Sequence, residues 1–179
     1  MNSERQRYIE GSLQEAVREF FGDYELGGAS QGTPDAQAGT SVELQLGSLV
    51  GFRGSSVRGG LAFVAPAALV AQLLPVPRAE SRAELQLRDW SAEIANQLVG
   101  RFKNKLSARA LDFDVSTAVC FRGTSMSVTF PPQTTDASVS VTTSWAGASV
   151  YLDCAFVDGV AVPDGPTLRI VPEGDVLLF

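Results

Sequence analysis

Near the middle of the chain, four residues have the types and the spacing of a surface site. At intervals of four, three and four residues, the sequence carries Asp89, Glu93, Asn96 and Gly100. In a helix this spacing places all four on one face. Two carboxylates, an amide and a glycine that permits close approach to the backbone would suit a polar partner. The alternative is that they only form a solvated helix face, which is common for acidic and amide side chains.

The segment that contains these residues has the pattern of a long amphipathic helix. Over residues 82–109, apolar residues recur at about 100° per residue and gather on the side opposite the four polar positions. We therefore predict a helix over this segment, with its apolar side in the core. The side chains expected to be buried are Trp90, Ile94, Leu98, Phe102 and Leu106.

The composition limits the chemistry available to the chain. Its 179 residues include 45% hydrophobic residues, 19% charged residues and no histidine, with a formal net charge of −6. Without histidine, Ser-His-Asp and Cys-His catalysis, histidine-ligated zinc and phosphohistidine transfer are excluded. The negative charge and the lack of a Lys/Arg cluster argue against a nucleic-acid partner. No metal site is expected, and Cys120 and Cys154 are predicted to be small buried side chains.

The length fits one domain with a single sizeable core. We predict one domain over residues 1–179, with a core over about 3–157 and an extension over 158–179 that has no functional interpretation. The chain contains no apolar run of about 18 residues, and its start, MNSERQRYIE, lacks the apolar segment of a signal peptide. A cytoplasmic protein without membrane insertion is therefore expected.

The first half of the chain predicts a helix, strands and a short helix. A capping-box sequence at Ser3 begins a helical stripe of about five turns, and the Gly-rich residues 27–40 predict a loop. Pro66 suits the first turn of a short helix over 67–74. Between the loop and this helix, strands are expected over 42–46, 49–52 and 60–64.

The second half is again a helix followed by strands, and it repeats a short sequence of the first half. Residues 50–57 read VGFRGSSV and residues 119–126 read VCFRGTSM. We interpret this as an internal duplication with pseudo-twofold symmetry, although any strand that leads into a glycine turn would look similar. The predicted fold class is α+β, with two long helices packed on an antiparallel sheet. The strands expected after the central helix are 113–121, 126–130, 139–145 and 149–156.

Residues 89–100, DWSAEIANQLVG, resemble the signature of the CheC/CheX/FliY chemotaxis phosphatases. That family carries an acidic residue or a serine, then E-x-x-N, on an exposed helix. Residues 46–54 and 60–63 are similar to two further segments of CheX-like proteins. The resemblance implies a CheC-like α/β sandwich and a homodimer. It also implies one site per chain, because no E-x-x-N occurs at Glu10, Glu15 or Glu19.

The resemblance also implies a function for the four helix residues. In a CheX-like phosphatase acting on a phosphorylated CheY-type response regulator, Asn96 would orient the attacking water and Glu93 would pair with a lysine of the regulator. Asp89 and Gly100 would contribute to docking. No cofactor would be bound by this chain, because the Mg²⁺ belongs to the regulator.

The sequence departs from the family at Ser116, where CheX-like proteins carry a proline in a strand. We expect this difference to leave the helix motif intact but to change the local shape beside the site. It motivates a competing hypothesis, in which the chain is an inactive adaptor that docks a signalling or motility partner without hydrolysis. A third hypothesis is a scaffold component related to the flagellar switch.

Overall fold

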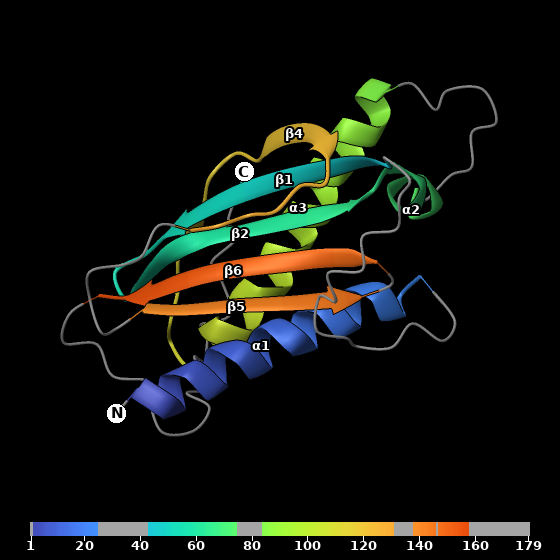
Figure 1. The fold of residues 1–179 in the computed structure, drawn as a ribbon. Helices are drawn as coiled ribbons and strands as arrows, with labels where there is room; N and C mark the ends of the chain where they lie inside the picture. Colours follow the sequence, from blue (N-terminus) through green and yellow to red (C-terminus); the bar gives the residue numbers. More distant parts are fainter. Residues whose placement is uncertain (1, 25–42, 75–83, 131–137, 146, 158–179) are drawn as a thin grey trace, which may run out of the picture.

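In the computed structural model, helices and one antiparallel sheet are built from both halves of the chain, as the α+β prediction requires (Figure 1). The structure describes residues 2–24, 43–74, 84–130, 138–145 and 147–157. The predicted loop 27–40 and the predicted extension 158–179 lie outside these residues. The elements are α1 (Asn2–Gly22), β1 (Leu44–Arg53), β2 (Val57–Pro66), α2 (Ala67–Gln72), α3 (Glu84–Ser107), β3 (Asp114–Val115), β4 (Val119–Thr124), β5 (Ser138–Trp145) and β6 (Ala148–Phe156).

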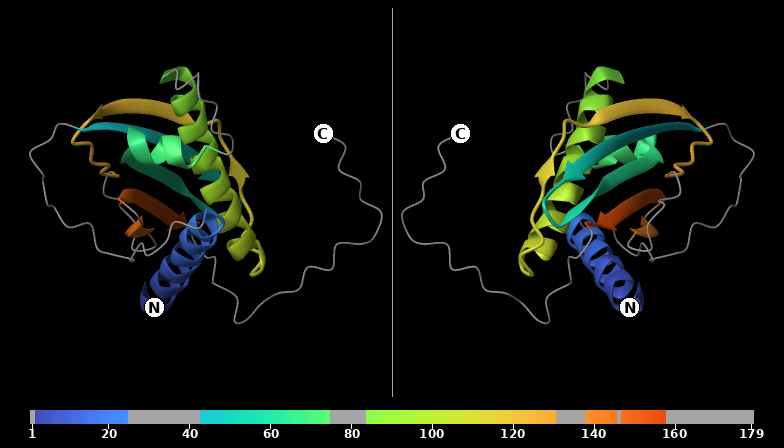
Figure 2. Two further views of the ribbon diagram at one scale, coloured as in Figure 1. Left: turned by 90° about the vertical axis from the view of Figure 1, so that its right-hand side faces the viewer. Right: turned by 90° about the vertical axis from the view of Figure 1, so that its left-hand side faces the viewer.

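The described strands form a sheet in the order β3-β1-β2-β6-β5, and β4 also pairs with β1, on the same edge as β3. Both long helices lie on one side of this sheet (Figure 2). Helix α3 contacts β1, β2 and β4, whereas α1 contacts β5 and β6, and the two helices contact each other. The buried apolar residues of the helices and the sheet form one cluster. No helix in the described ranges is long and apolar enough to span a membrane.

The helix predictions agree with the structure except at the helix ends. Helix α1 begins at Asn2, so Ser3 lies inside it and does not precede it as a cap. Pro66 precedes α2, as predicted, but α2 ends at Gln72 and not at residue 74. Helix α3 covers nearly all of the predicted segment.

One strand replaces the two that were predicted over 42–46 and 49–52. Gly47 and Ser48 interrupt the apolar alternation in the sequence, but both lie within β1. The Phe121 ring of β4 lies where a Cβ on Gly47 would be, with its Cε2 atom 2.2 Å from that position. A glycine is therefore required here inside a continuous strand. Ser48 faces the opposite side, where it is fully buried.

Two predictions in the second half were wrong. Residues 126–130 form no strand: Ser125 has a positive φ of 56°, and the Met126 N–H donates to the side-chain oxygen Oε1 of Gln45 at 2.7 Å. The predicted strand 113–121 is divided into β3 and β4, because Val115 pairs with Phe52 while Val119 pairs with Leu49. Three residues, 116–118, thus oppose the two residues of β1 between these pairs, as in a β-bulge.

Burial was predicted correctly for most of the apolar side of α3. Ile94, Leu98, Phe102 and Leu106 are fully buried, but Trp90 is only half-buried. Of the two cysteines, Cys154 is buried as predicted, and burial raises the pKa of its thiol to about 12. Cys120 is only partly buried, because β4 lies at an edge of the sheet. The internal duplication stays a prediction.

Shortening a core side chain of α3 tests this arrangement. Leu98→Ala should lower the free energy of unfolding by about 2–5 kcal/mol, because it leaves a cavity in a closely packed core. Asn96→Ala, on the exposed face of the same helix, should change it by less than about 0.5 kcal/mol. Urea unfolding followed by circular dichroism measures both values. Equal losses in the two variants would contradict the orientation of α3.

A second test concerns Ser116, which lies in the bulge. Its N–H donates to the carbonyl oxygen of Gly51 at 2.9 Å, and its Oγ accepts the Gly51 N–H at 3.0 Å. Proline at this position would lose both hydrogen bonds, so Ser116→Pro should lower the free energy of unfolding by about 1–3 kcal/mol. Ser116→Ala keeps the backbone bond and should cost about 0.5–1.5 kcal/mol. Urea titration measures the stability of both variants, and equal stabilities would contradict this account.

Candidate functional site

The exposed face of α3 carries the residues that the sequence singled out. Asp89, Glu93 and Asn96 are exposed, on the side of the helix opposite its buried residues. At Gly100, nothing lies within 4 Å of the position that a Cβ would occupy, apart from the helix's own nearby backbone. The structure therefore confirms that these positions share an open helix face.

The Glu93 carboxylate is held by a neighbour on the same helix. Gln97 donates a hydrogen bond from Nε2 to Oε1 of Glu93 at 2.9 Å. This contact fixes one carboxylate oxygen and leaves the second for a partner, since a carboxylate accepts several hydrogen bonds. Gln97 was not predicted as a site residue, although the spacing of four residues from Glu93 is a signal for such a pair.

Two cations near this face, Arg101 and Lys103, are paired with acidic residues of the chain. On the α1 side, Arg101 forms an ion pair with Asp23. On the other side, Lys103 lies 3.4 Å from Asp112. Burial tends to raise the pKa of Asp112, but the Phe113 amide, Lys103 and Ser107 outweigh it and lower the pKa from its usual value.

No ion pair among the described residues involves Asp89 or Glu93. The negative charge of these two carboxylates is therefore left for a cationic group of a partner.

The end of α1 borders the site, which the sequence did not reveal. Tyr24 is half-buried against Phe20, with ring centroids 5.2 Å apart. Burial raises the pKa of Tyr24, Arg101 opposes this effect, and Asp23 and Glu93 add to it. The ion pair between Arg101 of α3 and Asp23 places the end of α1 beside the α3 face. Only tertiary packing brings these segments together, so local sequence patterns carried no signal for the contact.

Helix α3 is fixed along its length by polar contacts with both neighbours. Near its beginning, Ser91 shares a hydrogen bond of 2.8 Å with Ser48 of β1, and both hydroxyls are buried. Near its end, the Tyr8 hydroxyl donates to the carbonyl oxygen of Lys105 at 2.7 Å, and Lys105 forms ion pairs with Glu15 and Glu19. These contacts set the direction in which the exposed face points.

Ser116, the departure from the family pattern, contacts a different part of the molecule. Its hydrogen bonds join it to Gly51 of β1 and to the carbonyl oxygen of Thr117. Glu93 and Asn96 take no part in these bonds. The residues that surround Ser116 at the nearest pocket belong to β1, β2 and β3, not to α3. If Ser116 changes the local shape, as expected, the change therefore affects the sheet and not the exposed face of α3.

The described residues contain no group of three or more carboxylate, cysteine or histidine side chains placed to hold a metal ion. Asp89 and Glu93 are two acidic residues one turn apart on an open surface. They can interact with a cation that a partner presents. The absence of a cofactor on this chain stays a prediction.

Several solved structures of chemotaxis proteins have a similar fold. A CheC-like superfamily protein from Shewanella sp. PV-4 has a TM-score of 0.60 and 18% identity, covering 84% of this chain and 97% of that one. Chemotaxis protein CheX from Vibrio vulnificus has a TM-score of 0.58 and 18% identity, covering 86% and 99%. The CheX-CheY-BeF3-Mg²⁺ complex from Borrelia burgdorferi has a TM-score of 0.54 and 17% identity, covering 82% and 96%. At these identities the similarity establishes the fold.

Sequence comparison identifies the family. No curated protein sequence matches the chain. The family model described as chemotaxis phosphatase CheX matches residues 46–142, which is more than half of the chain and includes the whole of the exposed face of α3. This protein therefore belongs to the CheX family of chemotaxis phosphatases.

Proposed function

We propose that this chain accelerates hydrolysis of the aspartyl phosphate of a phosphorylated CheY-type response regulator. The observation that carries the proposal is the exposed E-x-x-N pair, Glu93 and Asn96, on a helix that is fixed from both sides. The family and the fold support the same class of reaction. The partner class is supported by the Borrelia burgdorferi relative, whose structure is a complex of CheX with CheY.

Asn96 is suited to the placement of the attacking water. In phosphoryl transfer, a metal ion and cationic groups neutralise the phosphoryl oxygens, and much of catalysis is the positioning of the nucleophile. The Mg²⁺ and a lysine would come from the regulator, so no cofactor need reside on this chain. The Asn96 carbonyl would accept a hydrogen bond from the water, and an amide keeps the same charge at all working pH values.

Glu93 would dock the regulator through its lysine. A carboxylate and an ammonium group form a charge-assisted hydrogen bond, which is stronger than a neutral one. Gln97 holds one oxygen of Glu93, and the nearby cations Arg101 and Lys103 are engaged by Asp23 and Asp112. No ion pair among the described residues engages Glu93, so the regulator's lysine could pair with it.

Asp89 and Gly100 would form the two ends of the docking surface. Asp89 lies one turn before Glu93 and is exposed, so it extends the acidic surface along α3. Gly100 follows Asn96 by one turn and has open space in place of a side chain. The regulator's surface could therefore approach the α3 backbone most closely at Gly100. Homodimer formation and a cytoplasmic location stay predictions.

Substitutions on α3 separate positioning from docking. Asn96→Ala should lower the stimulated rate of dephosphorylation by about 10²-fold or more while affinity for the phosphorylated regulator is kept, because only the transition state loses a contact. Glu93→Ala should weaken both binding and turnover. Release of phosphate from candidate regulators measures the rate, and titration with a beryllofluoride-loaded regulator measures affinity.

The chain offers matched controls for both variants. Gln6 and Glu10 on α1 form the same type of hydrogen-bonded pair, at 2.9 Å, as Gln97 and Glu93, so Glu10→Ala controls for loss of a helical carboxylate that accepts from a glutamine. Asn104→Ala removes another exposed amide from α3. Both controls should retain activity. If the wild-type chain binds a phosphorylated regulator without shortening the phosphate lifetime, the phosphatase proposal fails and the adaptor hypothesis replaces it.

A further inference from the structure

Gln97 lies one turn after Glu93 on α3 and is half-buried. It belongs neither to the buried apolar side of the helix nor to the four predicted site residues. Its Nε2 donates to Oε1 of Glu93 at 2.9 Å. Side chains four residues apart on a helix are neighbours, so the two residues can make this contact along one turn of α3. Gln97 is therefore placed to control where the Glu93 carboxylate points.

The orientation of the Glu93 carboxylate affects how readily a partner can bind it. An exposed glutamate has several rotatable bonds, and ordering such a side chain at an interface costs binding free energy. Part of this cost is met before docking when a hydrogen bond within the free protein already holds the carboxylate. Gln97 holds one oxygen, and the second oxygen can accept from a lysine without a further change of rotamer.

The neutral charge of Gln97 matters as much as its hydrogen bond. A lysine at this position would form an ion pair with Glu93, because opposite charges four residues apart on a helix attract each other. The regulator's lysine would then meet a neutralised carboxylate and a second cation. An amide donates a hydrogen bond but carries no charge, so it leaves the full negative charge of Glu93 for the partner.

Arg101, the cation one turn after Gln97, is held by other groups. It forms an ion pair with Asp23, and its guanidinium lies over the ring of Phe20 at 5.9 Å from the ring centroid. Both contacts hold the guanidinium against the end of α1. Among the described residues, no ion pair joins Arg101 to Glu93. The neighbour that binds the Glu93 carboxylate is therefore a neutral amide.

From these contacts, we propose that Gln97 is a positioning residue that sets the affinity of this chain for its phosphorylated response regulator. It acts through Glu93, whose carboxylate it orients without neutralising the charge. The inference rests on the proposed function, in which Glu93 docks a lysine of the regulator. Asn96, which would orient the water, lies outside this contact, so Gln97 affects docking and not the chemical step.

Two substitutions of Gln97 in the full chain test the proposal. Methionine is similar in length but lacks the donor, so Gln97→Met should raise KM for the phosphorylated regulator by about 2- to 10-fold with kcat unchanged. Gln97→Lys introduces a cation that pairs with Glu93, and it should raise KM by at least about tenfold. Phosphate release at varied regulator concentration gives KM and kcat, and titration with a beryllofluoride-loaded regulator gives Kd.

A double variant shows whether Gln97 acts through Glu93. In Glu93→Ala the amide has lost its acceptor, so the addition of Gln97→Met should change Kd by less than about twofold. A residue that contacted the regulator directly, or that only stabilised the helix, would weaken binding by the same factor with and without Glu93. Circular dichroism confirms that each variant is folded.

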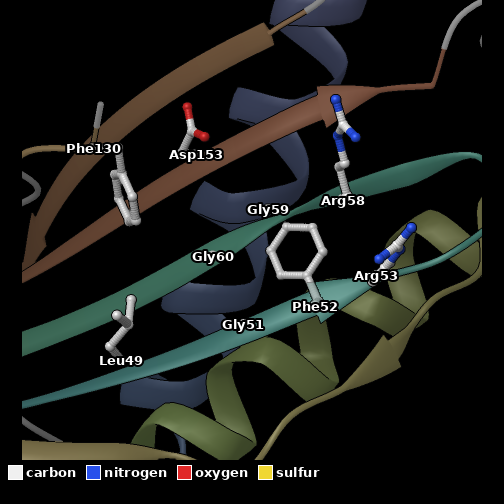
Figure 3. A pocket seen from close by; sticks show the side chains of 9 residues that line it. All are labelled: Leu49, Gly51, Phe52, Arg53, Arg58, Gly59, Gly60, Phe130 and Asp153. Carbon is white, nitrogen blue, oxygen red and sulfur yellow. The ribbon is translucent and has the colours of Figure 1, made fainter. Parts of the chain in front are cut away.

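Two control variants change the charge elsewhere. Gln6 on α1 also donates to a glutamate, Glu10, at 2.9 Å, so Gln6→Lys makes the same charge change beside the same kind of carboxylate. Arg58 is exposed on the opposite face of the sheet, where it lines a pocket of about 420 Å³ (Figure 3). Arg58→Gln changes the net charge by one unit far from α3. Both controls should keep KM within about twofold of the wild-type value, because distant exposed charges are screened by salt.

Three results would overturn the role of Gln97 and leave the proposed function intact. They are a KM in Gln97→Met equal to that of the wild type, a fall in kcat without a rise in KM, and equal losses of affinity with and without Glu93. If the wild-type chain binds the beryllofluoride-loaded regulator but does not accelerate phosphate release, the phosphatase proposal fails, and the Kd values decide the role of Gln97. An absence of binding to every candidate regulator would overturn both.

Discussion

The packing of α3 against the sheet is the interaction on which the rest of the structure depends. The fully buried Phe102 ring lies 6.1 Å from Phe52 of β1 and 6.2 Å from Phe113, between ring centroids. Within this apolar contact, the buried hydroxyls of Ser48 and Ser91 satisfy each other. A buried hydroxyl without a partner is costly, so this pair favours one rotational setting of the helix. That setting turns Glu93 and Asn96 outward.

Helix α1, which packs against α3, also constrains how α3 is placed. Glu15 and Glu19 of α1 pair with Lys105 of α3, and Asp23, which directly follows α1, pairs with Arg101 near the exposed face. Exposed ion pairs contribute little to stability on their own. The Arg101–Asp23 pair also affects the local charge, because it engages a cation near Asp89 and Glu93, which form no ion pair among the described residues.

The sequence was sufficient to predict helix α3 and the exposed position of its polar residues, because the 3.6-residue period of a helix can be recognised within one short segment. It was insufficient where a distant side chain decides the structure. Gly47 was read as a break between strands, whereas Phe121 of β4 fills the space beside it. Residues 126–130 resemble a strand, but Gln45 binds the Met126 amide and no described strand pairs with this segment. Such partners become visible only after the sheet has been assembled.

The alternation of β1 also separates the two surfaces of the molecule. Its inward residues, Ser48, Val50 and Phe52, belong to the buried side that supports α3. Its outward residues, Gly51 and Arg53, line the pocket on the other face. Because successive side chains of a strand point to opposite faces, a change at Arg53 leaves the packing of α3 untouched. The helix face and the sheet pocket can therefore be altered independently, although one strand builds part of both.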